Sequence, residues 1–341
     1  MNWGCGAAGS APAWHAGGQG FKSPQLHSMN RYRDSGFQIP KAWTNVNMSD
    51  QSGKKFLITG ATSGLGLAAA TALTAKGGEV TITARNLKKG ARAQEQSGAA
   101  HLLELDLADL ASVREAAAKV TTPFDVVILN AGVMAIPYRL TADGFEMQLG
   151  TNHLGHFAFA GLIKSQIKGR LISMASQAHR LGTFGDHSKE EIRTRALGKG
   201  KYSPWSAYGD SKLANLLFTN EIERLRLREK WDFISIACHP GWANTNLQKV
   251  GPMMAGRSFQ AKVMIATSAL LAQTPLEGAY PALCAATYPN LLGASYLGPN
   301  GLGEMRGTPK FTHGKALAYD QSLARNLWEV SEELTGVSWE G

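Results

Sequence analysis

Tyr208 and Lys212 stand four residues apart in a stretch whose pattern predicts a long helix over residues 206–228. In a helix this spacing puts both side chains on one face. A free tyrosine has a pKa of about 10, so it is a poor acid–base catalyst at neutral pH unless a neighbouring charge stabilises its phenolate. The ammonium group of Lys212 would lower the pKa of Tyr208 in this way. The pair predicts a tyrosine that exchanges a proton, although the same spacing also occurs by chance.

A glycine-rich turn over residues 59–66 lies between a predicted strand and a predicted helix. Its glycines would let the backbone turn tightly and approach a pyrophosphate, which would bind the free N–H groups at the helix start. A P-loop is disfavoured because Leu67 follows Gly66, where that motif requires lysine. The turn predicts a dinucleotide site, and a glycine turn without a ligand is the alternative. The residues expected to contact the dinucleotide are Gly60, Thr62, Ser63, Gly64, Leu65 and Gly66.

The end of the predicted strand over residues 79–84 bears on which dinucleotide would bind. Enzymes that use NAD usually carry an acidic residue there for the ribose 2′-hydroxyl, whereas an arginine accommodates the 2′-phosphate of NADP. This chain has Arg85 at that place, followed by Lys88 and Lys89. The sequence predicts NADP (NADPH when reduced), with Arg85 and Lys89 at the phosphate. Ordinary surface cations at a helix start are the alternative.

Short apolar runs alternate with helical patterns along the chain, and these elements must position the residues above. The pattern predicts strands over 56–59, 79–84, 101–105, 125–129, 169–174 and 231–238, and helices over 65–76, 109–120, 145–167 and 206–228. This alternation predicts an α/β fold with a single Rossmann-type, doubly wound parallel sheet and helices on both faces. Ligands bind such sheets at the carboxyl ends of the strands, so Tyr208 and Lys212, after the fifth strand, would lie beside the crevice.

Length and composition predict one folded domain. The chain has 341 residues, of which 44% are hydrophobic, and can bury a full core. Residues 1–42 are rich in Gly, Ala, Ser and Pro without an apolar period, so we expect a disordered extension before a domain over residues 43–341. No apolar run approaches the roughly 18 residues of a membrane span, and no secretory signal is expected. The three scattered cysteines favour a reducing compartment, so we expect a cytoplasmic protein.

The net charge of +9 does not predict a nucleic-acid partner. The basic residues are dispersed along the chain. The local group over residues 189–201 is interleaved with Glu190 and Glu191, which is typical of a solvated face. Metal binding is not expected either, because His153, His156, His179 and His239 have no acidic or cysteine partner at ligand spacing. We interpret these histidines as packing or hydrogen-bonding residues.

From Trp43 to the C-terminus the chain resembles the short-chain dehydrogenase/reductase family, and within it the retinol-dehydrogenase-like members. The resemblance rests on motifs that occur together in the order typical of the family. They are the glycine turn over 59–66, Asp106-Leu107, Asn130-Ala131-Gly132, Asn152 in Thr151-Asn152-His153-Leu154-Gly155, Ser176, Tyr208, Lys212, and His239-Pro240-Gly241 followed by Thr245.

The resemblance implies catalytic roles for four residues. Tyr208 would exchange its proton with the substrate, whose oxygen Ser176 would hydrogen-bond. Lys212 would hold the nicotinamide ribose and depress the pKa of Tyr208, helped by the positive ring of the oxidised nicotinamide. Asn152 would hold a water that connects Lys212 to solvent. Ser173 is a rival for the serine role, but Ser176 fits the family's pattern better.

The resemblance also implies further cofactor contacts. Asp106 and Leu107 would meet the adenine, Asn130, Ala131 and Gly132 would line the cofactor floor, and Thr245 with the preceding Pro240-Gly241 turn would meet the carboxamide.

The implied activity is hydride transfer between nicotinamide and a carbonyl or alcohol carbon of an apolar small molecule. The stretch over residues 182–205 is long and polar and predicts a loop at the mouth of the site, so retinoid-like, steroid-like and other carbonyls stay open. Met253, Met254 and Met264 would line an apolar pocket or belong to the core. The alternatives are a sensor or scaffold protein that binds NADP without turnover, and a specialised reductase on the same scaffold. An oligomer is compatible with the resemblance.

Overall fold

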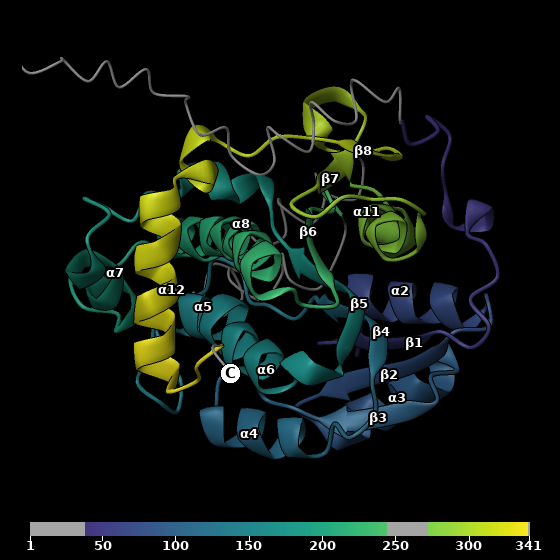
Figure 1. Ribbon diagram of the computed structural model, residues 1–341, viewed down its shortest axis with the longest axis horizontal. Helices are drawn as coiled ribbons and strands as arrows, with labels where there is room; N and C mark the ends of the chain where they lie inside the picture. The colour runs from purple at the N-terminus through teal and green to yellow at the C-terminus, as the bar shows by residue number, and fades with distance from the viewer. Residues whose placement is uncertain (1–37, 244–271, 340–341) are drawn as a thin grey trace, which may run out of the picture.

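The computed structural model describes residues 38–243 and 272–339. Within them an eight-stranded sheet has the order β3-β2-β1-β4-β5-β6-β7-β8 (Figure 1). The pairs from β3 to β7 are parallel and the pair β7·β8 is antiparallel. The strand order reverses between β1 and β4, which makes this the switch point where ligands bind in open α/β sheets. The predicted doubly wound sheet is confirmed, and the antiparallel edge strand is an addition that the sequence patterns did not indicate.

The strands are β1 (Lys55–Ile58), β2 (Glu79–Ala84), β3 (His101–Glu104), β4 (Phe124–Leu129), β5 (Ile167–Met174), β6 (Ile234–Cys238), β7 (Tyr296–Pro299) and β8 (Pro309–Phe311). The α-helices are α2 (Gly64–Thr74), α3 (Leu87–Ser97), α4 (Leu110–Ala118), α5 (Met147–Leu149), α6 (Gly155–Leu162), α7 (Lys189–Ala196), α8 (Pro204–Glu229), α11 (Pro275–Thr287) and α12 (Gln321–Thr335). A π-helix, η2 (Gly150–Leu154), joins α5 to α6. The 3-10 helices are η1 (Asn45–Asn47), η3 (Lys164–Gln166), η4 (Gln177–Leu181), η5 (Leu302–Glu304) and η6 (Ala316–Tyr319).

Alternating side chains of the strands contribute to apolar clusters on both faces of the sheet. In β1, Phe56 and Ile58 pack with α2 and α11, whereas Leu57 points to the opposite face with α4, α6 and α8. Figure 1 shows α2 and α11 on one side of the sheet and α6 and α8 on the other. Strands buried on both faces read as continuous apolar runs, which explains why these runs were recognisable in the sequence.

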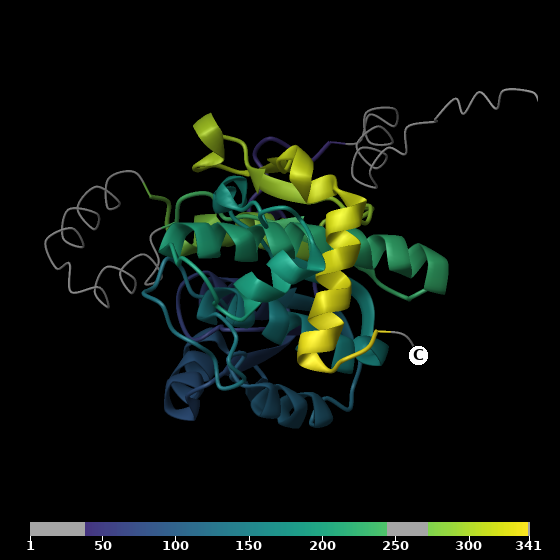
Figure 2. The ribbon, with the colours of Figure 1, turned by 90° about the vertical axis from the view of Figure 1, so that its left-hand side faces the viewer.

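The C-terminal part of the chain adds a further layer beyond the sheet. Helix α12 crosses α8 (Figure 2) and also packs against α6 and α7. Trp328 of α12 and Trp339 pack around Phe157 and Phe218, with ring centroids of Phe157 and Trp328 5.0 Å apart. This aromatic cluster holds the outer face of α8, the helix that carries Tyr208 and Lys212.

Three predicted elements differ from the structure. The expected helix over 145–167 is divided into α5, the π-helix, α6 and a 3-10 turn, and Ile167 already begins β5. The expected strand over 231–238 begins only at Ile234, because the rings of Trp231 and Phe233 stack on each other 5.8 Å apart before the sheet. The expected loop over 182–205 contains α7, whose start is capped by the Ser188 hydroxyl accepting from Glu191 N–H at 3.1 Å.

The expected boundary at residue 42 falls inside a packed segment. Ile39 is 7% exposed and belongs to the same core cluster as Trp43 and Met48. The carbonyl of Lys41 accepts hydrogen bonds from Asn300 and Thr308. Residues 38–42 are therefore anchored to the domain, and residues 1–37 of the expected extension lie outside the described residues.

Candidate functional site

The candidate site lies where the carboxyl ends of β1, β4, β5 and β6 meet. Thr59 follows β1, Asn130 follows β4, Ser176 comes two residues after β5, and His239 follows β6. Thr59 ties two of these ends together, because its hydroxyl accepts hydrogen bonds from the backbone N–H groups of Asn130 (2.9 Å) and Ala131 (3.0 Å). The Asn130 side chain returns a bond of 2.8 Å to the Thr59 carbonyl.

The glycine turn has the geometry that a pyrophosphate needs. Gly60 and Gly64 have positive φ angles of 66° and 58°, which favour glycine. A Cβ on Gly60 would lie 2.6 Å from the Cβ of Ala131, and one on Gly66 would lie 2.5 Å from the Asn130 side chain. The Ser63 side chain makes no capping bond to α2, in contrast to Asn86 at α3 and Asp109 at α4. The first N–H groups of α2 therefore stay open toward an anion, so this cradle fits a dinucleotide.

The residues expected at the adenosine end differ in their surroundings. Arg85 and Lys89 are both exposed, and the Arg85 side chain has no hydrogen bond or ion pair within residues 38–243 and 272–339. Asp106 uses one carboxylate oxygen to accept from Ala108 N–H at 3.0 Å. Leu107 is buried, and its carbonyl would lie 2.3 Å from a Cβ on Gly155, so this glycine lets α6 approach the turn.

Tyr208 and Lys212 are buried neighbours on α8, and Ser176 lies close to the tyrosine. Tyr208 and Lys212 are each 5% exposed, and the ammonium nitrogen of Lys212 lies 5.8 Å from the centroid of the Tyr208 ring. The Ser176 hydroxyl lies near the Tyr208 phenol and favours its ionised form. Lys212 also donates to the carbonyl of Met174 at 2.9 Å, which fixes the lysine against the end of β5.

Two glycines allow these groups to approach one another. A Cβ on Gly182 would lie 2.5 Å from the Gly209 carbonyl, and a Cβ on Gly209 would lie 2.7 Å from the Gly182 amide. The backbone that follows η4 therefore touches the backbone of α8 next to Tyr208. Any larger side chain at either position would separate Ser176 from Tyr208.

The pKa of Tyr208 contradicts the expectation from the sequence. Burial raises the pKa of Tyr208 to about 12, and the hydrogen bond from Ser176 lowers it only in part. Burial also lowers the pKa of Lys212 to about 8. In the polypeptide by itself, loss of hydration outweighs any stabilisation of the phenolate by Lys212. The phenol is therefore protonated at neutral pH.

Asn152 lies in the π-helix beside Gly132 and Lys212. Its side chain accepts from Val133 N–H at 2.8 Å and donates to the Val133 carbonyl and to the Ser211 hydroxyl, both at 2.9 Å. A Cβ on Gly132 would lie 2.9 Å from the Asn152 carboxamide oxygen and 3.7 Å from the lysine nitrogen. Asn152 thus joins the turn after β4 to α8, and both polar atoms of its side chain form hydrogen bonds with other residues of the protein.

The two candidate serines have different environments. Ser176 is half-buried and contacts Tyr208. Ser173 lies within β5, and its hydroxyl is buried without a hydrogen-bond partner. The geometry therefore brings Ser176, and not Ser173, to the tyrosine.

Comparison with known proteins agrees with this geometry. Residues 54–186 match the family model described as short chain dehydrogenase. Human retinol dehydrogenase 13 is 34% identical over 298 residues, which cover 84% of this chain and 85% of that protein. The chloroplastic short-chain dehydrogenase TIC 32 B of Brassica napus is 34% identical, with 82% and 87% covered. The chain belongs to the short-chain dehydrogenase/reductase family.

A solved structure shares the same fold along its whole length. An uncharacterized protein from Mycobacterium paratuberculosis superposes with a TM-score of 0.74 at 36% sequence identity, covering 88% of this chain and all of that one. Membership of the short-chain dehydrogenases makes the chain an oxidoreductase that acts on CH–OH or C=O groups with a nicotinamide cofactor. Among the described residues of this short-chain dehydrogenase, no helix is both long and apolar enough to cross a membrane.

Sequence reasoning missed several residues that hold the site of this short-chain dehydrogenase together. His179 bonds the Ser176 carbonyl through Nδ1 at 2.6 Å and accepts from Lys315 N–H at 3.1 Å. His239 lies 3.0 Å from a carboxylate oxygen of Glu304, and burial lowers the pKa of His239. The contacts with Lys315 and Glu304 left no signal in the chain, because their partners are 136 and 65 residues away.

Part of the expected cofactor site lies beyond the described residues. Pro240 and Gly241 follow β6, and Gly241 has φ of 67° with the Met305 carbonyl 2.4 Å from its Cβ position. Thr245 and the three methionines, Met253, Met254 and Met264, lie outside the described residues.

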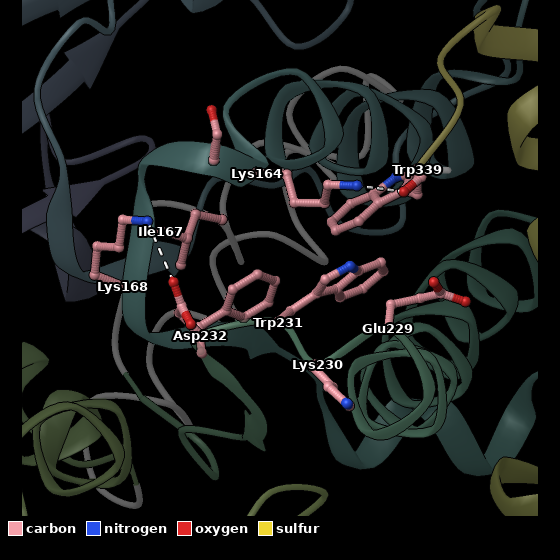
Figure 3. Close-up of a pocket in the computed structure, with 10 residues that line it drawn as sticks. Lys164, Ile167, Lys168, Glu229, Lys230, Trp231, Asp232 and Trp339 are labelled. Atoms are coloured by element: carbon pink, nitrogen blue, oxygen red, sulfur yellow. Dashed lines mark hydrogen bonds and ion pairs between the residues drawn. The ribbon is translucent and has the colours of Figure 1, made fainter. Parts of the chain in front are cut away.

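A separate cavity of about 540 Å³ lies near the amino ends of β5 and β6, at the opposite ends of the strands from the candidate site (Figure 3). Two of its lysines have partners: Lys164 donates to the Trp339 carbonyl and lies 4.9 Å above the Trp231 ring, and Lys168 pairs with Asp232 at 3.4 Å. None of the described residues predicted for catalysis or cofactor binding lines this cavity, so the candidate active site is at the carboxyl ends of the strands.

Proposed function

We propose that this chain is an NADP-dependent oxidoreductase that reduces the carbonyl group of an apolar small molecule, or oxidises the corresponding alcohol. The observation that carries the proposal is the buried contact of Ser176 with Tyr208, with Lys212 beneath the same ring. It lies beside a helix start whose N–H groups are open toward an anion. These groups fit proton exchange next to a bound dinucleotide.

The side chains divide the chemistry between them. When bound, the nicotinamide ring supplies or accepts the hydride. Tyr208, protonated at neutral pH because burial raises its pKa to about 12, would donate its proton to the substrate oxygen. Ser176 would hydrogen-bond the same oxygen. Lys212, whose pKa of about 8 leaves it largely charged at pH 7, would hold the ribose and favour proton loss from the phenol. The protonated phenol is the form that donates a proton in carbonyl reduction.

Arg85 supports NADP over NAD. It is exposed directly after β2, where NAD enzymes place an acid. Lys89 in the first turn of α3 adds a second cation, and its N–H is already taken by the Asn86 side chain at 3.0 Å. An additional phosphate would therefore meet the side chains of Arg85 and Lys89.

Exposed apolar side chains near the site support an apolar substrate. Leu181, at the end of η4, is 54% exposed, and Trp205, whose ring lies 6.1 Å from that of Tyr208, is 45% exposed. Trp242, after the Pro240-Gly241 turn, is 39% exposed. Burying such side chains against a ligand would be favourable, whereas leaving them in water is not.

The cytoplasmic location stays a proposal that rests on the scattered cysteines, and a relative with a chloroplastic name makes a plastid the alternative.

Tyr208→Phe tests the proposed function. The substitution keeps the ring but removes the phenolic proton, so NADPH should still bind while turnover falls by roughly 10²–10⁴-fold. Turnover would be followed through NADPH absorbance on a panel of aldehydes and ketones. Tyr138→Phe is the matched control, since it removes the same atom from a half-exposed tyrosine outside the Ser176–Lys212 cluster.

Undiminished turnover of Tyr208→Phe on a substrate that the wild type reduces would move the proton donor to another group. NADPH binding by the wild type with no turnover on any member of the panel would favour a sensor or scaffold protein instead.

A further inference from the structure

His156 connects three segments of the candidate site. It lies on α6 and is 2% exposed. Its Nε2 atom is 2.8 Å from the Thr59 hydroxyl at the end of β1, and its Nδ1 atom is 3.1 Å from the Asn152 carbonyl in the π-helix. Through Thr59 it also reaches the turn after β4, whose N–H groups at Asn130 and Ala131 bond that hydroxyl.

The hydrogen-bond pattern determines which nitrogen of His156 carries the proton. The Thr59 oxygen already accepts two N–H bonds, so its own proton must be donated. The His156 Nε2 atom at 2.8 Å is nearer than the other acceptor, the Ile128 carbonyl at 3.5 Å. Nε2 is then an acceptor, so Nδ1 carries the proton and donates it to the Asn152 carbonyl.

The ring is also neutral at working pH. Burial lowers the pKa of His156 to about 4, and the charge of Lys212 acts in the same direction. The neutral Nδ1–H form is the one that satisfies Thr59 and Asn152 together. With both nitrogens bonded, the ring can neither rotate nor titrate without breaking one contact.

Asn152 transmits this constraint to the lysine. Its side chain bridges Val133 and Ser211, which precedes Lys212 on α8. Its backbone lies in a π-helix, where the hydrogen-bond ladder departs from the regular α-helical pattern, so a side-chain bond to its carbonyl adds a restraint there. The His156 Nδ1–H supplies that restraint.

We propose that His156 is a positioning residue, which holds Asn152 and the turn after β4 in register with Lys212 and so sets the turnover rate. The proposal rests on the proposed function for its kinetic consequence, but its structural part does not depend on it. His156 touches neither substrate nor the reacting atoms in this role.

His153 offers a matched control on the same stretch of chain. It is equally buried, but its Nε2 atom bonds the Ser331 hydroxyl of α12 at 2.9 Å and neither Thr59 nor the Asn152 carbonyl. His156→Phe and His153→Phe each remove one buried imidazole. Only the first should lower kcat, by roughly 10–100-fold for a misplaced catalytic group, while the Kd for NADPH changes less than about threefold.

Two further variants separate hydrogen bonding from packing. His156→Asn retains a donor near the position of Nδ1 and should recover most of the lost kcat. His156→Gln reaches toward Thr59 but has no donor at the Nδ1 position, so its kcat should stay low even if His156→Phe does not fold. Equal losses of kcat in the His153 and His156 variants, or a His156→Asn enzyme no faster than His156→Gln, would overturn the proposal.

A spectroscopic measurement tests the structural part without turnover. In the full chain with ¹⁵N-labelled histidine, the long-range ¹H–¹⁵N spectrum at pH 7 should show His156 as the neutral Nδ1–H tautomer, assigned by its absence in His156→Asn. The Nε2–H tautomer or a charged ring would overturn the proposal. If this signal appears as expected and the wild type reduces no carbonyl, the proposed function fails while the positioning geometry stands.

Discussion

Replacing Arg85 with alanine should weaken NADPH binding much more than NADH binding. Arg85 is exposed and unpaired among the residues that the structure describes, so no internal contact is lost with it. Only NADPH carries the phosphate that the guanidinium can pair with. A charge-assisted contact at an exposed position is worth on the order of 1–2 kcal/mol, which corresponds to roughly a 5–30-fold rise in Kd.

The assay is a fluorescence titration of both reduced cofactors against wild type and variant at fixed ionic strength. Arg92→Ala is the matched control, because Arg92 is an exposed cation farther along α3 and its loss changes the net charge equally. The Kd for NADH should change less than about twofold in both variants. Equal weakening of NADPH and NADH, or an effect of Arg92→Ala as large as that of Arg85→Ala, would refute the reasoning that Arg85 recognises the phosphate.

Two further predictions concern the N-terminus and the lysine. Deleting residues 1–37 should leave the melting temperature unchanged. Deleting residues 1–42 also removes the buried Ile39 and should lower the free energy of unfolding by about 1.5–3 kcal/mol. Thermal unfolding that shows the same loss of stability for both deletions would contradict this prediction. Because Lys212 is charged below its pKa of about 8 and neutral above it, kcat/KM for carbonyl reduction should fall as the pH rises through that value. Lys212→Arg keeps the charge to higher pH, so this fall should move upward, and an unmoved profile would assign it to another group.

The sequence allowed the sheet and the carboxyl-edge residues to be predicted because their signals are local. Buried parallel strands read as apolar runs, and the glycine turn at residues 59–66 has its strand and its helix directly beside it. The spacing of Tyr208 and Lys212 likewise predicts a shared helix face, and both residues are buried on α8. The family resemblance added Ser176, which the structure brings to the tyrosine.

The remaining features depend on contacts between distant parts of the chain. His156 and Thr59 are 97 residues apart, so no window of sequence reveals their hydrogen bond. The raised pKa of Tyr208 reflects how completely the surrounding elements exclude water, which spacing alone does not indicate. The division of residues 145–167 also escapes periodicity, because a π-helical turn differs from an α-helix in its ladder and hardly in its residue types.

The two described segments that flank residues 244–271 lie side by side in the domain. Ala243 forms a β-bridge with Gln273, the Trp242 N–H donates to the Met305 carbonyl at 2.6 Å, and the Gly307 N–H donates to the Gln273 side chain at 3.2 Å. With both ends joined in this way, doubling the length of the intervening segment would add only about 0.6 kcal/mol of closure entropy. These contacts involve only residues at the two described ends, so Ala243 and Gln273 form a fixed attachment point whose geometry depends on the sheet and not on the length of the chain between them.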